Sequence, residues 1–453
     1  MSGTGDEYHA LAEMFERSQV EAYRPDPNDP VYAKKRRRRR RGRWIAAGVV
    51  FALVAAAAGT YLPLTLLAPV AATPAAFAEP TVETPAAVAF PVPYALATAI
   101  SVTGAEEFPG TVGVDGVLNA TGGNEARSIA SLSKVITALV ILAAKPLEPG
   151  QAGPTLSFGK AENDTYDKYY VLGATIAPMK IGSSMSQHDA LAMMLMVSAS
   201  NYAEVTSTWA LGSQANVRSA TTRWLADNGL TGTTIVEPTG IDPRNVSTPT
   251  DLLKIARLAM ANPVVAEIVG TQNAQLGSLG MQSNRNPVLG VDGIVGIKTG
   301  TLDDAGSCLL FTAVTDVGLD APITIVGVVL GAPNGGTAGD TARGMIQAVT
   351  GGFHRVPAVA SGTQLGDYVT PWEDTAGIVA GAGGNLLTWS DTPVDVTSTI
   401  EPVGIAKDGT EVGSLTFTAG TRTLTVPLEL SGAINGPGGW WRVTHPRELL
   451  FEQ

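Results

Sequence analysis

The sequence predicts an α+β domain that follows a membrane anchor and precedes a small all-β domain. Three observations predict this organisation. A basic run leads into an uncharged stretch at residues 44–67, strand-like segments enclose helical segments within residues 94–356, and apolar residues alternate with polar ones in the last hundred positions. The chain of 453 residues is long enough for two or three units with separate cores.

The anchor is predicted from charge and length together. Nine of the ten residues from Lys34 to Arg43 are basic, and no charged residue follows until after Leu67. An uncharged helix of this length crosses a hydrocarbon core of about 30 Å. The basic flank places residues 1–43 in the cytoplasm as a tail and the later domains outside the cell.

A cleaved signal peptide is the alternative interpretation of the same stretch. Ala76-Phe77-Ala78 has the small-x-small form of a cleavage site. We favour a retained anchor at the cell membrane, because the apolar stretch is longer than the usual signal core of about 7 to 15 residues. Residues 68–93, which are rich in Ala and Pro, are predicted to form a semi-stiff linker that lifts the next domain off the membrane.

Composition excludes several functional classes. The net charge is −11, and the residues after Arg43 carry 34 acidic and 19 basic side chains, which argues against nucleic-acid binding by the folded domains. The single cysteine, Cys308, excludes internal disulfides and cysteine-based zinc sites. The four histidines lie far apart in the sequence, so no local histidine motif for a metal is present.

Residues 94–356 mix strands and helices. Short strands are expected at 97–103 and 111–118, and a nearly continuous apolar strand at 321–330. Between them, Ser186-x-x-Asp189 and Thr248-x-x-Asp251 stand as capping boxes ahead of apolar helices. One sheet is expected to join the two ends of this segment, with the helices packed on it.

Residues 357–453 are predicted to form the all-β domain. Apolar residues alternate at period two before and after Ala419-Gly420, which is typical of a hairpin. Four of the seven tryptophans also lie in this part of the chain.

The first candidate for chemistry is an S-x-x-K motif. Ser131 and Lys134 stand three residues apart at the start of an apolar helical segment, so their side chains share one face. Burial lowers the pKa of a lysine, and a neutral lysine can accept the proton of a nucleophilic serine. The alternative is a helix-start serine beside a lysine whose ammonium group reaches solvent.

The second candidate is a K-T-G motif at the end of an apolar strand. Lys298, Thr299, Gly300 and Thr301 lead into what we expect to be the second strand of a hairpin, residues 305–311. A lysine and two hydroxyl groups at a strand edge suit a carboxylate, and the glycine allows a substrate backbone to approach closely. The two motifs together are a much stronger signal than either alone.

The sequence thereby resembles the penicillin-binding serine D,D-peptidases, in which S-x-x-K, S-x-N and K-T-G recur in this order. It is most similar to the low-molecular-mass D-alanyl-D-alanine carboxypeptidases of actinobacterial type, with supporting phrases at 128–134, 237–241, 291–301 and 440–446. The resemblance implies the penicillin-binding and β-lactamase-like transpeptidase fold, helices packed on an antiparallel sheet, for residues 94–356. It implies neither a metal nor a cofactor.

The middle motif departs from the family pattern. The sequence Ser198-Ala199-Ser200-Asn201 places Ser198 at the S position and Ser200 where an asparagine is expected. A shift by one residue, to Ala199-Ser200-Asn201, would instead make Asn201 the motif asparagine and lose the serine. We prefer the first register, in which Ser198 relays a proton and Asn201 partly replaces the missing amide in binding substrate.

The resemblance also implies roles and partners. Ser131 is the nucleophile and Lys134 its base, the backbone amides of Ser131 and Thr301 form the oxyanion hole, and Lys298, Thr299 and Thr301 hold the substrate carboxylate, with Arg343 a weaker candidate for the same pocket. The substrates are peptidoglycan stem peptides ending in D-Ala-D-Ala, and β-lactams are covalent inhibitors.

Three other functions remain open at this point. A D,D-endopeptidase would use the same residues. A class A β-lactamase would need a deacylating glutamate, and Glu237 lies in a phrase typical of the peptidases. A catalytically weak or inactive scaffold at the cell envelope would retain the fold.

Overall fold

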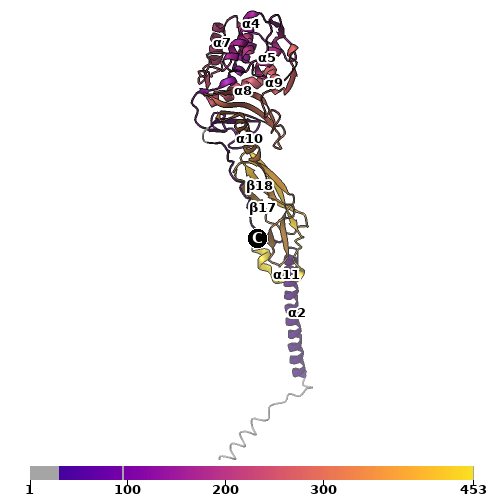
Figure 1. The fold of residues 1–453 in the computed structure, drawn as a ribbon. Coiled ribbons are helices and arrows are strands. Elements are labelled where there is room, and N and C mark those ends of the chain that lie inside the picture. The colour runs from indigo at the N-terminus through magenta and orange to yellow at the C-terminus, as the bar shows by residue number, and fades with distance from the viewer. Residues whose placement is uncertain (1–29, 94–95, 452–453) are drawn as a thin grey trace, which may run out of the picture.

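The computed structural model describes residues 30–93 and 96–451, so the predicted cytoplasmic tail lies largely outside the described residues. Figure 1 shows an elongated molecule, with most of its helices at one end, a β-rich part in the middle and the long helix α2 at the other end. Helix α2 spans Pro30–Leu66 and includes the predicted anchor. It is the one helix of the described residues that is long and apolar enough to cross a membrane.

A five-stranded antiparallel sheet organises the α+β part. Its strand order is β10-β11-β12-β2-β3, and the edge strand β10 carries the K-T-G motif. The bounds are β2 Ala97–Thr103, β3 Asn119–Thr121, β10 Ile294–Leu302, β11 Gly306–Thr315 and β12 Ile323–Ala332. The pairing of β2 with β12 confirms that one sheet joins the two ends of the segment.

Helices cover both faces of this sheet. Alternate residues of β11 and β12 point to opposite faces, so Leu310 and Val328 join the larger core with α3, α5, α6 and α8, whereas Phe311 and Val329 join a second core with α10. The helices are α3 Ser133–Ala144, α4 Lys160–Val171, α5 Gln187–Leu195, α6 Ser200–Leu211, α7 Gln214–Asp227, α8 Pro249–Ala261, α9 Pro263–Gly270 and α10 Gly335–Gly351. Two short 3₁₀ turns are η1 Ala130–Leu132 and η2 Gly277–Leu279.

The predicted capping boxes begin helices. The Ser186 hydroxyl accepts a hydrogen bond from the Asp189 amide at the start of α5, and the Thr248 hydroxyl accepts one from the Asp251 amide at the start of α8. Three small two-stranded sheets connect these helices: β4 Arg127–Ser128 with β7 Val246–Ser247, β5 Thr155–Ser157 with β6 Ser184–Ser186, and β8 Asn273–Gln275 with β9 Met281–Ser283.

The prediction of a strand at 111–118 is wrong. This segment forms turns, because Gly113 and Gly116 adopt left-handed conformations with φ of 65° and 74°. At Gly113 an added Cβ would lie 1.9 Å from the Val117 carbonyl oxygen, so the chain folds back tightly there.

The β-rich part contains a six-stranded sheet of order β1-β14-β15-β19-β18-β17 and the pair β13-β16. The expected hairpin around Ala419-Gly420 is confirmed as β18 and β19. The bounds are β1 Ala76–Phe77, β13 Phe353–Val359, β14 Gln364–Val369, β15 Thr375–Ala380, β16 Gly384–Trp389, β17 Asp395–Ile400, β18 Glu411–Ala419 and β19 Arg422–Ser431. Two short helices follow, α11 Gly439–Thr444 and α12 Pro446–Leu450.

Residues of the predicted linker lie along this β-rich part. Strand β1 pairs with β14, Thr73 forms a bridge with Val403, and the Val88 amide donates to the Ser390 hydroxyl at 3.0 Å. The segment therefore runs as an additional edge of the β-rich part, held by backbone hydrogen bonds.

Candidate active site

Ser131 and Lys134 meet at the junction of η1 and α3. The Lys134 Nζ lies 2.9 Å from the Ser131 Oγ and also donates to the Thr239 carbonyl oxygen at 2.6 Å. The lysine is fully buried, and burial lowers its pKa to about 7, although the nearby Glu237 carboxylate acts in the opposite direction. The pair therefore has the distance and the proton affinity needed for a lysine to activate a serine.

The K-T-G strand packs directly against this turn. An added Cβ at Gly300 would lie 3.0 Å from the Ser131 amide nitrogen and 3.1 Å from the Ala130 side chain, so a larger residue would push β10 away from the serine. Thr299, Gly300 and Thr301 line a cavity of about 240 Å³ at this strand, and Ser131, Lys134 and Lys298 are not among its lining residues. The structure thus brings the two sequence motifs together at one edge of the sheet.

Lys298 is buried and close to other cations. Its Nζ donates to the Thr299 carbonyl oxygen at 2.9 Å. Burial, followed by the charges of Lys134 and Arg285, holds the pKa of Lys298 well below its usual value. The two cations lower the pKa of Lys298, whereas a bound anion would raise it. The surroundings of Lys298 therefore suit a carboxylate.

Arg285, which was not predicted, lies at the cavity where the sequence analysis expected Arg343, and its Nη1 donates to the Thr175 hydroxyl at 2.9 Å. Arg285 lines the same cavity as Thr299 and Thr301, whereas Arg343 pairs with Asp292 at 2.7 Å and is absent from the residues that line it. Arg285 stands in the loop between β9 and β10, within Asn284-Arg285-Asn286. Its position shortly before the K-T-G strand is the only sequence signal that could have indicated it.

The middle motif lies where α6 begins. Ser198 is buried and has a left-handed backbone, with φ of 67°, just before the helix. Ser200 is also buried, and its amide donates to the Thr175 carbonyl oxygen at 2.8 Å. Helix α6 packs on α3, but no hydrogen bond within the described part of the chain joins Ser198 or Ser200 to Lys134.

Asn201 makes a structural contact. Its side-chain oxygen accepts from the Ala177 amide at 3.1 Å, and its side-chain nitrogen donates to the Ala177 carbonyl oxygen at 2.8 Å. The residue is fully buried. Because both ends of the amide bind the Ala177 backbone, the contacts argue against the expected role of Asn201 in substrate binding and favour the register with Ser198 and Ser200.

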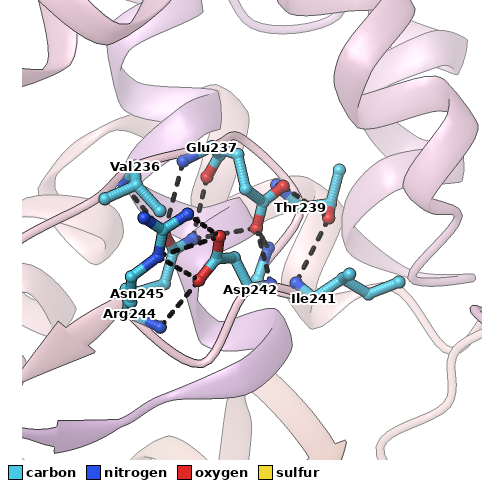
Figure 2. A network of polar contacts seen from close by, with 8 residues as sticks. Val236, Glu237, Thr239, Ile241, Asp242, Arg244 and Asn245 are labelled. Atoms are coloured by element: carbon cyan, nitrogen blue, oxygen red, sulfur yellow. Dashed lines mark hydrogen bonds and ion pairs between the residues drawn. The ribbon is translucent and has the colours of Figure 1, made fainter.

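Glu237 organises the loop that supports Lys134 (Figure 2). Its carboxylate accepts from the Thr239 amide and hydroxyl, both at 2.7 Å, and from the Gly240 amide at 2.6 Å. Asn245 links this loop to the serine helix, since its side-chain nitrogen donates to the Ser133 hydroxyl at 3.0 Å. Glu237 therefore fixes the carbonyl that Lys134 binds and places a negative charge near the same lysine.

In this geometry a serine lies beside a lysine that can act as its base. Residues 114–334, slightly less than half of the chain, match the model of the peptidase S11 family, described as D-alanyl-D-alanine carboxypeptidase. No curated protein matches the sequence of the chain.

Several solved structures are similar to this chain. Penicillin binding protein 5 from Haemophilus influenzae is 16% identical, with a TM-score of 0.50, over 78% of this chain and 100% of that one. A D-alanyl-D-alanine carboxypeptidase from Francisella tularensis is 15% identical, with a TM-score of 0.49, over 79% and 97%. A Streptomyces K15 DD-transpeptidase is 22% identical, with a TM-score of 0.47, over 57% and 98%.

Proposed function

We propose that the protein is a serine-type D-Ala-D-Ala carboxypeptidase that removes the terminal D-alanine from peptidoglycan stem peptides through an acyl-enzyme. The observation that carries the proposal is the 2.9 Å contact between Ser131 Oγ and the buried Lys134 Nζ. The match to the D-alanyl-D-alanine carboxypeptidase family model supports this substrate class and leads us to expect acylation by penicillins.

Acylation begins when Ser131 Oγ attacks the carbonyl carbon between the last two D-alanines and passes its proton to Lys134. The negative charge that develops on the carbonyl oxygen is bound by the backbone amides of Ser131 and Thr301. The C–N bond then breaks, and Ser198 relays a proton to the leaving D-alanine nitrogen. Water hydrolyses the resulting ester and restores Ser131.

Recognition of the substrate takes place in the cavity beside the K-T-G strand. Thr299, Gly300 and Thr301, which line this cavity with Arg285, bind the terminal carboxylate together with Lys298 of the same strand, and Arg285 supplies a further positive charge. Ser200 stands in place of the usual asparagine and contributes one hydroxyl where an amide would offer two donors and an acceptor. We therefore expect the enzyme to be active but slow, and this substitution is also the observation that favours the weak or inactive scaffold as a second candidate.

The test uses the full chain in detergent, with a fluorescent penicillin and a pentapeptide ending in D-Ala-D-Ala. We expect a labelled protein and release of free D-alanine. Ser131→Ala should abolish both, whereas Ser157→Ala, at an exposed serine away from the site, should leave both unchanged. Labelling that survives Ser131→Ala would refute the role of Ser131, and absence of any labelling in the unaltered chain would favour the scaffold. Product analysis on a cross-linked peptide separates the endopeptidase from the carboxypeptidase.

The location of the enzyme is a second part of the proposal. Helix α2 spans the membrane once as a retained anchor, with residues 1–43 in the cytoplasm and the peptidase domain (94–356) and β-rich domain (357–453) outside. A reporter fused after Gln453 should be active only outside the cytoplasm. Activity of that fusion in the cytoplasm would refute the orientation, and a mature chain that begins near Ala78 would refute the anchor.

A further inference from the structure

A second cavity of the peptidase domain lies away from Ser131 and the K-T-G strand. It measures about 410 Å³, a size that suits a small molecule, and strand β5 and the helices α4, α6 and α7 contribute to its walls. Its lining residues include Glu162 and Thr165 of α4, Glu204 and Trp209 of α6, and Gln214 of α7. Figure 1 shows α4 and α7 at the end of the molecule farthest from α2, so the cavity lies at the end opposite the predicted anchor.

Two glutamates line the cavity, and each bonds to the protein through a single oxygen. Glu162 Oε2 accepts a hydrogen bond from the Gly159 amide at 2.8 Å, which caps α4. Glu204 Oε2 accepts from Lys168 Nζ and from the Tyr169 hydroxyl, both at 2.5 Å. Within the described part of the chain, the Oε1 atom of either glutamate makes no hydrogen bond. Two neighbouring helices therefore each supply an unused acceptor at the cavity.

Three further polar side chains of the wall have already used their hydrogens. The Thr165 hydroxyl donates to the Glu162 carbonyl oxygen at 2.6 Å, and the Thr208 hydroxyl donates to the Glu204 carbonyl oxygen at 2.7 Å. The Gln214 Nε2 donates to the same Glu204 carbonyl oxygen at 3.3 Å and to the Thr208 Oγ1 at 2.5 Å. A hydroxyl has one hydrogen to donate and a side-chain amide has two, so these side chains retain only acceptor capacity. The polar wall therefore offers mainly acceptors to a ligand.

The lining residues are negatively charged on balance, and part of their surface is apolar. Among the described residues that line the cavity, two are acidic and none is basic. Two lysines contact the wall from outside: Lys168 pairs with one glutamate, and Lys145 Nζ lies 5.9 Å from the centroid of the Trp209 ring. Leu156, Val205 and the Trp209 ring supply the apolar surface. An alkyl stem packs on such a surface while its charged head group stays at the carboxylates.

We propose that this cavity binds a primary alkylammonium group, whose N–H groups donate to Glu162 and Glu204 and whose stem packs on Trp209. An ammonium offers three donors and no acceptor, which complements a wall of acceptors. A neutral hydroxyl group binds less well, because it lacks the positive charge that strengthens a hydrogen bond to a carboxylate. The amine is either a small free molecule or the side-chain amine of a peptidoglycan stem peptide. Neither Ser131 nor Lys134 takes part, so the site is independent of the proposed enzyme.

The test is isothermal titration calorimetry of the full chain in detergent with n-pentylamine, with the detergent alone as the blank. We expect the amine to bind, and pentan-1-ol, which has the same stem without the charge, not to bind. Ser131→Ala should bind n-pentylamine as the unaltered chain does, so a failure of the proposed enzyme would not affect the result.

Two variants of α4 locate the site. Glu162→Gln should weaken binding about tenfold, because a neutral amide replaces a charged acceptor. The glutamine can still accept from the Gly159 amide, so the helix keeps its cap. Ala161→Phe, at an exposed position that lines the cavity, should abolish binding by filling the space. Asp167→Asn, at an exposed acid of the same helix outside the lining, should leave binding unchanged. Thermal unfolding checks that each variant is folded.

A competition titration distinguishes the two sources of the amine. Displacement of n-pentylamine by the tripeptide L-Ala-γ-D-Glu-L-Lys, but not by its Nε-acetyl form, would support the site with a stem peptide as its ligand. Binding of n-pentylamine that the tripeptide does not displace would support the site with a free amine as its ligand. Absence of n-pentylamine binding, equal binding of pentan-1-ol, or binding that both Glu162→Gln and Ala161→Phe leave unchanged would overturn the proposal.

Discussion

The charge of Glu237 should set the pH at which Lys134 becomes an active base. Burial lowers the pKa of Lys134 to about 7 from an ordinary 10.5, and Glu237 opposes that shift. The difference corresponds to about 5 kcal/mol between the two protonation states. At pH 7 about half of the lysine is neutral, whereas with an ordinary pKa roughly one molecule in 3,000 would be. Below pH 7, acylation should therefore fall about tenfold for each pH unit.

Glu237→Gln removes the negative charge and preserves the size of the side chain. An opposite charge near a titrating group ordinarily shifts its pKa by about one unit or more, so the pKa of Lys134 should fall by about one unit. The midpoint of the acid limb then moves from near pH 7 to near pH 6. At pH 6 the neutral fraction rises about fivefold, whereas at pH 9 it is complete in both proteins. The variant also loses the hydrogen bonds that Glu237 accepts from Thr239 and Gly240, and this loss should lower the acylation rate by the same factor at every pH.

The assay is the rate of labelling by a fluorescent penicillin between pH 5 and pH 9. The readout is the midpoint of the acid limb, because the plateau also reports the geometry of the loop. Asp242→Asn is the matched control: Asp242 belongs to the same loop but pairs with Arg244, and its charge is not among the causes that shift the pKa of Lys134. A midpoint that stays in place or moves to higher pH in Glu237→Gln, or that moves equally in Asp242→Asn, would contradict the reasoning.

Three further predictions follow from the same site. Lys134→Met should be more stable than the unaltered chain at acid pH, by up to about 5 kcal/mol, because Lys134 keeps its proton up to about pH 10.5 when unfolded but loses it near pH 7 when folded. The unaltered chain therefore gains stability as the pH rises between these two values. Thermal unfolding measured over this pH range should show that gain in the unaltered chain and not in the variant. Ser198→Ala should slow penicillin acylation by about 10²- to 10⁴-fold, whereas Ser200→Asn should leave it unchanged or raise it. Arg285→Gln should raise KM for the pentapeptide about tenfold or more with a smaller effect on kcat, as measured by D-alanine release, since a charge-assisted hydrogen bond is worth about 1.5 to 3 kcal/mol; an unchanged KM would remove Arg285 from the carboxylate site.

The sequence predicts those parts of the site that depend on local spacing. Ser131 and Lys134 meet because they stand three positions apart on one helical turn, and the K-T-G strand pairs with the next strand because a tight turn joins the two. The caps at Ser186 and Thr248 are local in the same sense. In each case the interaction links residues within a few positions of one another, so the chain order contains the information.

The rest depends on contacts between distant parts of the chain. Arg285 lines the cavity whereas Arg343 pairs with Asp292, and nothing near either arginine in the sequence predicts this difference. Asn201 could be assigned to a structural role only when its partner, the backbone of Ala177, was known. The residues of the predicted linker follow the β-rich part for the same reason, since their partners lie more than 280 positions away.

The electrostatic balance of the site explains why recognition and catalysis occupy one strand edge. Lys134 and Lys298 are both buried, and each has a lowered pKa. Lys134 lies near the negative charge of Glu237, and with a pKa of about 7 it is about half neutral at pH 7. The charges that act on Lys298 are those of Lys134 and Arg285, both positive. Under the proposed function, a substrate carboxylate would supply the missing negative charge and favour protonated Lys298. We expect a ligand without that carboxylate to leave the cations unbalanced and to bind more weakly.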